Sequence, residues 1–167
     1  MRVIEKREGV IFGLDPSLTG TGIASAKEVT TLSTKGYKDT DRLIYIRDEV
    51  MEIVRDARLV VIEGFAYNKS NKAHEIGGLG WILRVAMAEE EVPYLEVAPT
   101  KLKKFATGKG NAGKIEVVTA AVNRLNISPK DDNQADAAWL REFGLHYLGA
   151  RGKKKLPQVN LEALAGV

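Results

Sequence analysis

The sequence predicts an α/β domain built on a mixed five-stranded sheet, with three antiparallel strands followed by two parallel strands and helices on its faces. Three short strand-like runs come first and are separated only by turn residues. Two more strand-like runs follow, each preceded by an amphipathic helical segment. Strands that alternate with helices are typical of parallel pairs joined by crossovers, which places helices over the sheet.

The first three strands are expected at residues 10–14, 20–26 and 29–35. A turn sequence, Pro-Ser-Leu-Thr-Gly, separates the first two runs, and Lys27-Glu28 separates the second from the third. Connections this short join antiparallel neighbours, so the three runs predict two consecutive β-hairpins.

Helices and strands alternate in the rest of the chain. Apolar residues at helical spacing predict a helix over Asp41–Arg55, and the uninterrupted apolar run Leu59–Ile62 is typical of a parallel strand covered on both faces. A second helix is expected over Ala73–Glu91 and a fifth strand over Pro93–Val97. The remaining helices are expected at residues 99–105, 114–125 and 132–148.

One domain is expected over residues 1–150, followed by a basic C-terminal tail over residues 151–167. A chain of 167 residues is long enough to bury a core without covalent cross-links. No stretch approaches the length of a membrane span, and the first residues lack the apolar centre of a signal peptide. We therefore expect a cytoplasmic protein, in a bacterial cell or a phage-infected host, without a membrane partner.

The composition limits the kinds of site that the chain can build. It has no Cys, which excludes thiol chemistry and thiolate metal sites, and only two His, His74 and His146, which disfavours a histidine-based zinc site. The 22 Asp and Glu residues supply oxygen ligands, which suit magnesium or manganese. The net charge is only +3, so basic binding surfaces must come from local clusters.

Three separate segments place a carboxylate where a strand ends or a helix begins. Asp15 and Glu63 end two apolar runs, and Asp132 and Asp136 are four residues apart at the start of a predicted helix. Taken singly, these acids have ordinary explanations. Asp131 or Asp132 could cap the helix, and Asp15 and Glu63 could be turn or surface carboxylates. Gathered at one sheet edge they would repel, by about 4 kcal/mol for a pair about 4 Å apart at an effective dielectric of about 20, and a divalent cation would remove that cost.

The sequence around these acids resembles RuvC-type Holliday-junction resolvases of the RNase H-like superfamily. Gly13–Gly22 resembles the first motif of that family, Val61–Glu63 with its aromatic loop resembles the second, and Gln134–Ala137 resembles the last. Thr107–Lys114 is similar to the family's basic loop, and the match runs in order from residue 10 to residue 148. The short chain and its departure around Asp132 would suit a phage-encoded member of the family.

The resemblance implies an RNase H-like fold, a magnesium-dependent endonuclease and a homodimer that acts on a four-way DNA junction. It implies that Asp15, Glu63 and Asp136 are catalytic metal ligands. The family commonly places its fourth ligand three residues before the last acid, which is Asn133 here. A neutral amide is a poorer ligand for a hard dication, so we favour Asp132, and the choice between these two residues stays open.

The expected reaction is two-metal hydrolysis of a phosphodiester, with two Mg²⁺ ions per active site and Mn²⁺ as a substitute. It would leave a 5′-phosphate and a 3′-hydroxyl. Holliday junctions are the expected substrate, and other branched DNA is a further candidate. The sequence does not indicate a base preference at the cut.

DNA contacts are expected in two segments. Lys101–Lys114 carries five lysines, three glycines and no acid, which suits a phosphate backbone, although a flexible solvated loop would have the same composition. The loop after Glu63 carries aromatic residues that the resemblance places at the junction centre, although Phe65 could equally pack in the core. The expected contacts are Phe65, Tyr67, Asn68, Lys69, Lys72, Lys104, Lys109, Asn111 and Lys114.

The helix predicted over Ala73–Glu91 is the expected dimer surface, although its apolar stripe could instead face the sheet. That stripe consists of Ile76, Leu79, Gly80, Leu83 and Met87.

Two other functions fit parts of the sequence. An ATP-binding protein of the actin and sugar-kinase type also has an Asp at the end of its first strand and a Gly-Thr-rich turn, but such folds need two domains and a longer chain. A junction-binding module without catalytic activity would require that the acids bind no metal.

Overall fold

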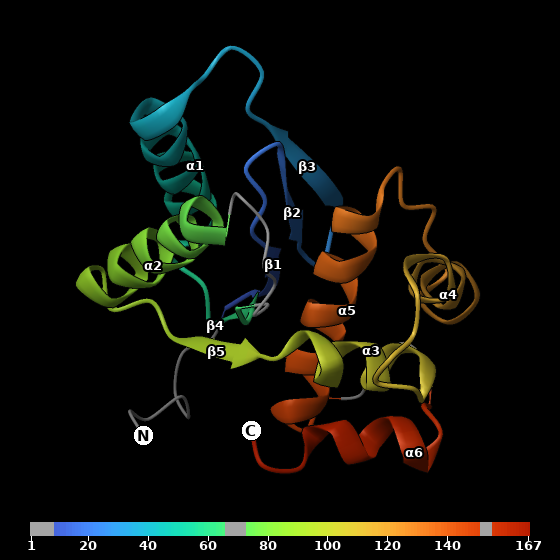
Figure 1. Ribbon diagram of the computed structural model, residues 1–167. Coiled ribbons are helices and arrows are strands. Elements are labelled where there is room, and N and C mark those ends of the chain that lie inside the picture. Colours follow the sequence, from blue (N-terminus) through green and yellow to red (C-terminus); the bar gives the residue numbers. More distant parts are fainter. Residues whose placement is uncertain (1–8, 66–72, 151–154) are drawn as a thin grey trace.

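The five strands form one mixed sheet with the predicted topology (Figure 1). The computed structural model describes residues 9–65, 73–150 and 155–167. The strand order is β3-β2-β1-β4-β5; the first three strands pair antiparallel, and β4 and β5 continue the sheet in parallel. The strands are β1 (Ile11–Asp15), β2 (Gly20–Ala24), β3 (Val29–Ser33), β4 (Leu59–Glu63) and β5 (Tyr94–Val97).

Helices cover both faces of this sheet, close to the predicted positions. One face carries α1 (Asp39–Val54) and α2 (Ala73–Glu89). The other face carries α3 (Pro99–Thr107), α4 (Lys114–Ala120), its π-helical extension η2 (Ala121–Leu125) and α5 (Asp132–Tyr147). Within the described ranges, no helix combines the length and apolar character needed to cross a membrane.

Strand β2 ends two residues earlier than predicted because a side chain closes the hairpin. The Ser25 hydroxyl oxygen accepts hydrogen bonds from the backbone N–H groups of Lys27 and Glu28, both at 3.2 Å. The Ser25 N–H donates to the Glu28 carbonyl at 2.8 Å. A serine that bonds to the backbone two or three residues ahead forms a turn, so the strand stops at Ala24.

The strands contribute alternate side chains to two separate cores. Phe12 and Leu14 of β1 belong to the core under α1 and α2, whereas Ile11 belongs to the core under α5. Strand β4 divides in the same way, with Val60 and Ile62 toward α1 and α2 and Leu59 and Val61 toward α5. Because strand side chains alternate, Asp15 and Glu63 both project from the face that α5 covers.

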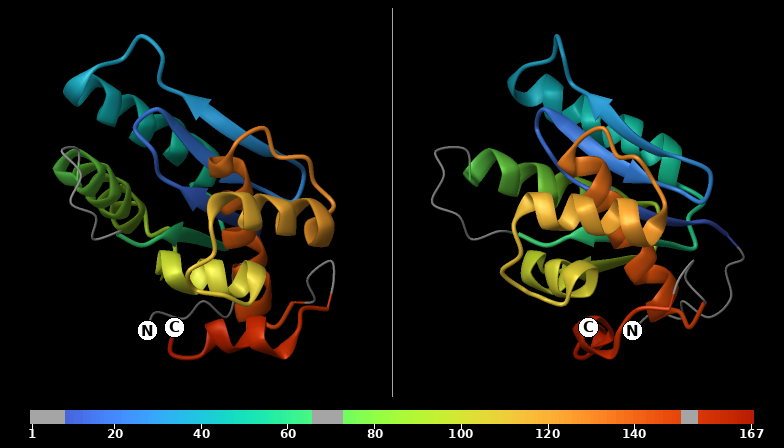
Figure 2. Two further views of the ribbon diagram at one scale, coloured as in Figure 1. Left: turned by 45° about the vertical axis from the view of Figure 1, so that its right-hand side comes forward. Right: turned by 90° about the vertical axis from the view of Figure 1, so that its right-hand side faces the viewer.

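Helix α5 lies directly on β1 and β2, because two glycines of the first motif leave room for its backbone (Figure 2). A Cβ at Gly13 would lie 1.9 Å from the Ala137 carbonyl oxygen, and a Cβ at Gly22 would lie 2.1 Å from the Asn133 carbonyl oxygen. Neither position has space for a side chain. The two glycines therefore determine how closely the first turns of α5 pack on β1 and β2.

The apolar stripe of α2 that we expected at a dimer surface faces the core. Leu79, Leu83 and Met87 are fully buried, so for these residues that expectation is wrong. The helix has a second apolar stripe because its sequence is apolar on most sides. Trp81 is 61% exposed and Val85 is 49% exposed on the outer side.

The C-terminal residues 155–167 pack on α3, whereas the sequence led us to expect a tail. They form α6 (Gln158–Leu161) and the 3-10 turn η3 (Glu162–Leu164), seen below α3 in Figure 2. Leu156 and Ala163 are buried, and the Asn160 Nδ2 donates to the Phe105 carbonyl at 2.7 Å. The segment packs on α3 because the burial of its apolar residues is favourable, in spite of the basic cluster before it. Residues 151–154 of that cluster lie outside the described ranges.

Candidate metal and nucleic-acid site

The first two acidic side chains of the predicted site lie at the ends of neighbouring parallel strands. Leu14 of β1 pairs with Ile62 of β4, so the next residues, Asp15 and Glu63, stand beside each other. Asp15 is only 5% exposed. Two carboxylates at adjacent strand ends, one of them buried, need either protons or a cation to coexist.

Helix α5 brings two more carboxylates to the same place. Asp136 lies one turn after Asp132, and both carboxylates interact electrostatically with Asp15. The adjacent Asp131 has a separate task, because its Oδ1 accepts the Gln134 N–H at 2.8 Å and so caps the helix. Its Oδ2 accepts the Thr31 hydroxyl at 2.8 Å, which ties the start of α5 to β3. Asp131 is therefore the N-cap residue of α5, and the Asp132 carboxylate belongs to the acidic cluster.

Burial raises the pKa values of the buried acids, and for Asp15 and Asp136 the charges of neighbouring acids raise them further. Burial raises the pKa of Asp15 well above its usual range, and the charges of Glu63 and Asp136 raise it further. Burial also raises the pKa of Glu63, opposed by a hydrogen bond with Asp15 and by the charge of Lys103. The pKa of Asp136 rises to about 7, through burial first and then through the charges of Glu63 and Asp132. Bringing these carboxylates together thus disfavours their charged forms, which a bound cation would favour.

Asp132 behaves differently because it has a basic partner. The Lys114 Nζ at the start of α4 donates to Asp132 Oδ2. This hydrogen bond lowers the pKa of Asp132 and raises the pKa of Lys114. The Asp132 side chain is 34% exposed, and the Lys114 side chain that reaches it lies largely in solvent. Asp132 is therefore the acid of the cluster that solvent and Lys114 already stabilise in its charged form.

The two candidates for the fourth ligand lie in different surroundings. Asp132 lies close enough to Asp15 and Asp136 to influence the pKa of both. The Asn133 carbonyl oxygen packs against Gly22, and its side-chain nitrogen lies 3.6 Å from the place that a Cβ at Gly20 would take. The amide of Asn133 therefore lies over β2, and the carboxylate of Asp132 lies with the other acids.

The acidic cluster has the donor chemistry of a divalent-metal site. All of its donors are carboxylate oxygens, the ligands that Mg²⁺ and Mn²⁺ prefer. Among the residues that the structure describes, no three acidic or histidine side chains are already spaced to hold a metal ion. Lys114 instead supplies positive charge to Asp132. The residues fit a divalent cation in charge and in donor type.

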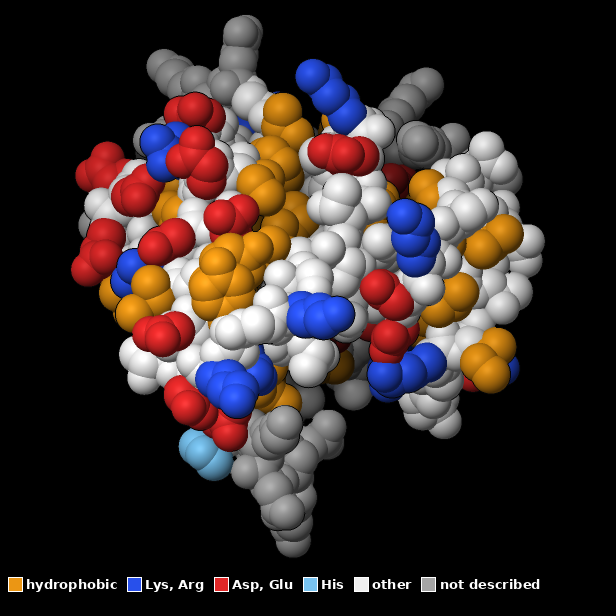
Figure 3. All heavy atoms as spheres, turned by 90° about the horizontal axis from the view of Figure 1, so that it is seen from above, with side chains coloured by type: hydrophobic (Ala, Val, Ile, Leu, Met, Phe, Trp, Pro, Cys, Tyr) orange, Lys and Arg blue, Asp and Glu red, His pale blue; other side chains and the backbone are white. Residues whose placement is uncertain are grey.

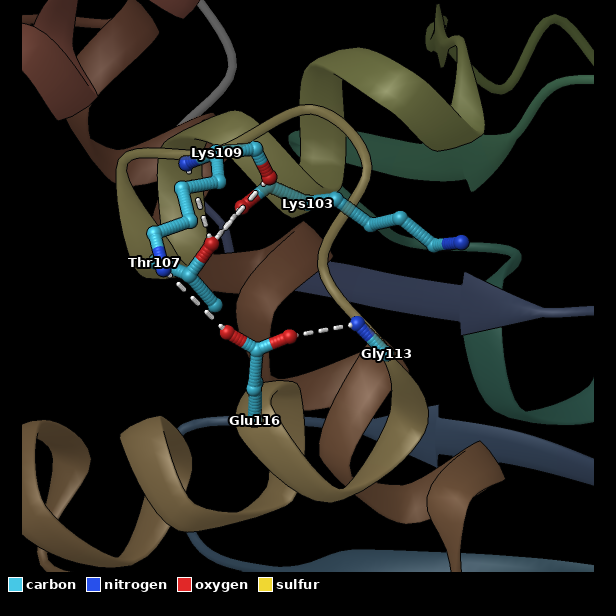
Figure 4. A network of polar contacts seen from close by, with 5 residues as sticks. All are labelled: Lys103, Thr107, Lys109, Gly113 and Glu116. Carbon is cyan, nitrogen blue, oxygen red and sulfur yellow. Dashed lines mark hydrogen bonds and ion pairs between the residues drawn. The ribbon is translucent and has the colours of Figure 1, made fainter.

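The loop between α3 and α4 is structured, although its composition also suits a flexible loop. The Thr107 hydroxyl donates to the Lys103 carbonyl at 2.8 Å and accepts the Lys109 N–H at 3.1 Å (Figure 4). Glu116 accepts the Gly113 N–H at 2.8 Å and lies 3.7 Å from the Lys109 Nζ. The Gly113 hydrogen bond, followed by the charge of Lys109, lowers the pKa of Glu116. These contacts order the loop, and the Lys114 contact with Asp132 joins its end to the start of α5.

The lysines of this region divide between two directions. Lys103, which we did not single out from the sequence, extends away from the loop (Figure 4), and its charge lowers the pKa of both Glu63 and Asp136. Lys104 pairs instead with Glu162 of η3 at 2.8 Å. Adjacent helix positions point about 100° apart, so Lys103 and Lys104 leave α3 in different directions. The sequence feature that could have identified Lys103 is its position beside the buried stripe of α3, which includes Leu102 and Phe105.

The other predicted DNA contacts are only partly described. Phe65 packs against α2, with its ring centroid 5.6 Å from that of Trp81 and 4.4 Å from the Arg84 Cζ. Asn111 is exposed on the α3–α4 loop. Tyr67, Asn68, Lys69 and Lys72 lie outside the described residues.

Comparison with protein families gives a match over most of the chain. Residues 11–140 match the family model described as crossover junction endodeoxyribonuclease RuvC. A protein of that name from a strain of Prochlorococcus marinus is 28% identical over 152 residues, covering 81% of this chain and 97% of the relative. Another, from Carboxydothermus hydrogenoformans, is 28% identical over 153 residues, covering 83% of this chain and 97% of the relative.

Solved structures give the same result. The structure described as T. thermophilus RuvC in complex with Holliday junction substrate matches with a TM-score of 0.64 and 25% identity, covering 80% of this chain and 91% of that chain. A second Thermus thermophilus RuvC structure matches with a TM-score of 0.66 and 23% identity, covering 84% of this chain and 97% of that chain.

Proposed function

Because the chain belongs to the RuvC family of crossover junction endodeoxyribonucleases, we propose that it cuts four-way DNA junctions at the acidic cluster described above. The observation that carries this proposal is the meeting of Asp15, Glu63 and Asp136, which come from β1, β4 and α5. These three acids come from distant parts of the sequence, and Asp15 is only 5% exposed. If they served only in packing, neutral residues would fill their places better.

The proposed metal ligands are Asp15, Glu63, Asp132 and Asp136. Members of this family depend on a divalent metal, and oxygen-only donors favour Mg²⁺, with Mn²⁺ as a substitute. We propose two ions per site. When bound, the ions supply positive charge to the attacking and leaving oxygens of the phosphodiester. The depth of Asp15 between the other acids makes it the proposed shared ligand.

The remaining residues of the site would bind and orient the DNA strand. Lys114 contacts Asp132, and a cation held by the acids would take over that contact and leave the exposed ammonium group of Lys114 available to a phosphate. Lys103 adds positive charge beside Glu63 and Asp136. Lys109 and Asn111 lie on the α3–α4 loop, whose glycines allow backbone N–H groups to approach the phosphates. Hydrolysis at this site would leave a 5′-phosphate and a 3′-hydroxyl.

We further propose that the protein acts as a homodimer on the junction. Its relative from T. thermophilus was solved in complex with Holliday junction substrate. Symmetrical cutting of two strands needs two active sites, and the outer face of α2 offers exposed apolar side chains for a second copy. Those side chains are Trp81 and Val85. Lys104 has its own ion pair away from the acids, so we place it at the margin of the DNA surface.

The decisive experiment compares cleavage and binding in variants that keep the shape of each acid. Asp15→Asn and Glu63→Gln should reduce cleavage of a synthetic four-way junction in Mg²⁺ by about a thousandfold or more, because each removes a charged ligand. Junction binding in Ca²⁺, measured by fluorescence anisotropy, should stay within about threefold of wild type, since the lysines supply that affinity. Asp131→Asn is the matched control, because Asn also caps helices, and it should cleave normally.

The same assay distinguishes the other functions. Full cleavage by Asp15→Asn would refute the proposed site. A wild-type protein that binds the junction but cuts nothing in Mg²⁺ or Mn²⁺ would be a binding module. Cutting a set of four-way, three-way, flap and linear DNAs, with the cut positions mapped on each strand, would define the substrate.

A further inference from the structure

Helix α2 carries one buried charge in its apolar middle. Between residues 76 and 88, Arg84 is the only charged residue, and it is 3% exposed. Burying a guanidinium group is unfavourable unless its N–H donors find acceptors. The acceptors of Arg84 therefore identify what this residue does.

The Arg84 guanidinium joins three parts of the structure. Its Nε donates to Glu96 Oε2 of β5 at 3.0 Å, and its Nη2 lies 2.8 Å from the same oxygen. Its Nη1 donates to the Gly80 carbonyl of α2 at 2.8 Å. Its Nη2 also donates to the backbone carbonyl of Glu63 at 3.1 Å, at the last residue of β4.

The same group also holds the first aromatic residue after β4. Phe65 lies against the guanidinium face, with 4.4 Å between the Arg84 Cζ and the ring centroid. A positive group over an aromatic face is an attractive contact. One side chain of α2 therefore touches Glu63 and, two residues later, Phe65.

Two glycines leave the space that these contacts need. A Cβ at Gly80 would lie 2.6 Å from Phe65 Cε1 and 3.0 Å from Arg84 Nη1. A Cβ at Gly64 would lie 3.0 Å from Glu96 Oε1. Because real Cβ atoms do not approach neighbours at 2.6 Å, a side chain at residue 80 would push the Phe65 ring away from Arg84.

We infer that Arg84 is a positioning residue of the active site. It fixes the end of β4 so that Glu63 meets Asp15 and Asp136. It also holds Phe65 at the head of the following loop. The inference rests on the proposed role of Glu63 as a metal ligand. A planar guanidinium can donate in several directions within its plane while an aromatic ring stacks on its face. A lysine ammonium can do only part of this, so Arg84→Lys removes the geometry and keeps the charge.

The competing explanation is that Arg84 only pairs with Glu96 to join α2 to β5. The two explanations differ in what they expect of Glu96→Gln. The Glu96 side chain is 45% exposed, so loss of its charge leaves Arg84 with the Glu63 carbonyl, the Gly80 carbonyl and Phe65. A simple ion pair predicts equal effects of Arg84→Lys and Glu96→Gln, whereas a positioning role predicts a much smaller effect of Glu96→Gln.

The first measurement is metal binding, because it does not require cleavage. The Mg²⁺ concentration that gives half of the maximal rise in melting temperature should increase by about fivefold or more in Arg84→Lys. Arg42→Lys is the matched control, since the Nε and Nη2 of Arg42 donate to the Tyr37 carbonyl at the start of α1, which covers the other face of the sheet from the acids. Arg42→Lys and Glu96→Gln should stay within about twofold of wild type.

The second measurement follows Phe65 through its neighbour Trp81. Trp81 is 61% exposed and Trp139 is fully buried, so acrylamide quenches the fluorescence of Trp81 selectively. Arg84→Lys should raise the quenching constant. Phe65→Leu should raise it too, yet keep the Mg²⁺ midpoint within about twofold of wild type, because the hydrogen bond to the Glu63 carbonyl is retained.

The outcomes are separable from those of the proposed function. A wild-type midpoint in Arg84→Lys, or an equal rise in Glu96→Gln, overturns the positioning role even if the enzyme cuts junctions normally. A wild-type protein that cuts no junction refutes the proposed function, and the Mg²⁺ midpoints still decide the role of Arg84. If Arg84→Lys does not fold, Gly80→Ala replaces it, since Ala favours a helix and its Cβ displaces Phe65 and Nη1. A wild-type midpoint in Gly80→Ala would also overturn the inference.

Discussion

Asp136 links the chemistry of the acidic cluster to the stability of the fold. Burial, with the charges of Glu63 and Asp132, raises its pKa to about 7, whereas an unfolded chain would titrate near the ordinary value of 3.8. A carboxyl group with a raised pKa in the folded state stabilises the fold most when it is protonated. Its contribution is therefore fully present below about pH 4 and is lost as the pH rises through about 7.

The metal-free protein should consequently lose stability between about pH 4 and about pH 7. The loss attributable to Asp136 is at most about 4 kcal/mol, from the difference between the two pKa values. Asp136→Asn removes this ionisation, so in EDTA at about pH 8 the variant should be more stable than wild type. Urea unfolding at several pH values, followed by circular dichroism, measures the free energy of unfolding directly.

Asp132→Asn provides the contrast within the same helix. Lys114 lowers the pKa of Asp132, so its charge stabilises the fold above the ordinary pKa and that stabilisation disappears as the pH falls. Asp132→Asn should therefore give no gain in stability at about pH 8. A gain equal to that of Asp136→Asn would mean that both acids are repelled alike and that Lys114 does not compensate.

The residues of this site differ in how well the sequence predicts them. Asp15 and Glu63 were predictable, because a carboxylate at the end of a buried strand needs a partner. Arg84 was not singled out, although a single arginine in an apolar helix is a similar signal. Its acceptors are largely backbone carbonyls and a half-exposed Glu96, and such pairings depend on tertiary contacts that no local pattern contains.

At the scale of elements, the contact of α5 with the first hairpin determines where the acids lie. The first motif has glycines on the two strands beneath α5, and at both the helix backbone fills the space of a Cβ. From the sequence alone, both glycines were expected within the first two strands, with no role in packing. Their use in packing becomes clear only when a helix that starts at Asp132, far along the chain, is placed on them.

Gly22→Ala should therefore destabilise the protein and disturb the site together. The added Cβ would meet the Asn133 carbonyl at 2.1 Å, which forces the start of α5 away from β2. We expect a loss of roughly 3 kcal/mol, at the upper end for overpacked cores. Urea unfolding gives the loss, and the Mg²⁺ midpoint of thermal stabilisation should rise because Asp136 moves with α5.

Gly78→Ala is the control for this prediction. Residue 78 lies in α2 with nothing within 4 Å of the Cβ position, so alanine should be neutral or stabilise by about 0.5 to 1 kcal/mol. Equal stability of Gly22→Ala and wild type would show that α5 can shift without cost and that Gly22 is not required for close packing.

The order and topology of the elements were predictable because the hydrophobic periodicities are clear. The run Leu59–Ile62 has no polar face, and the structure covers it on both sides. The exposed and buried stripes of α2 were not distinguishable, because that helix is apolar on most of its circumference. The docking of residues 155–167 was also missed, since a few apolar residues beside a lysine cluster carry no strong periodic signal.

On the scale of the whole molecule, the fold separates the acidic site from the surface proposed for a second copy. The acids lie on the α5 side of the sheet, and α2 lies on the opposite face. Figure 3 shows hydrophobic side chains gathered in a band toward the side of the molecule that carries α1 and α2, with acidic side chains beyond it. A partner placed on α2 would leave the acidic cluster open to DNA.

Val85 offers the sharpest test of this arrangement. It lies four residues after Trp81 on the outer stripe of α2 and is 49% exposed, so a lysine there can be solvated in the monomer. In a symmetrical dimer two such lysines would enter one apolar interface, which should weaken self-association by about a hundredfold or more. Val122→Lys is the matched control, because Val122 is 44% exposed on η2, on the other side of the sheet.

Sedimentation equilibrium decides the question, since a monomer has a mass of 18.3 kDa and a dimer has twice that mass. Wild type and Val122→Lys should sediment as dimers at micromolar concentrations, and Val85→Lys should sediment as a monomer with an unchanged melting temperature. The monomer keeps its acidic cluster, so it should still nick single strands of a junction but lose paired cuts. Dimers of Val85→Lys would exclude the outer stripe of α2 as the interface and would direct attention to the exposed Ile44 and Ile53 of α1.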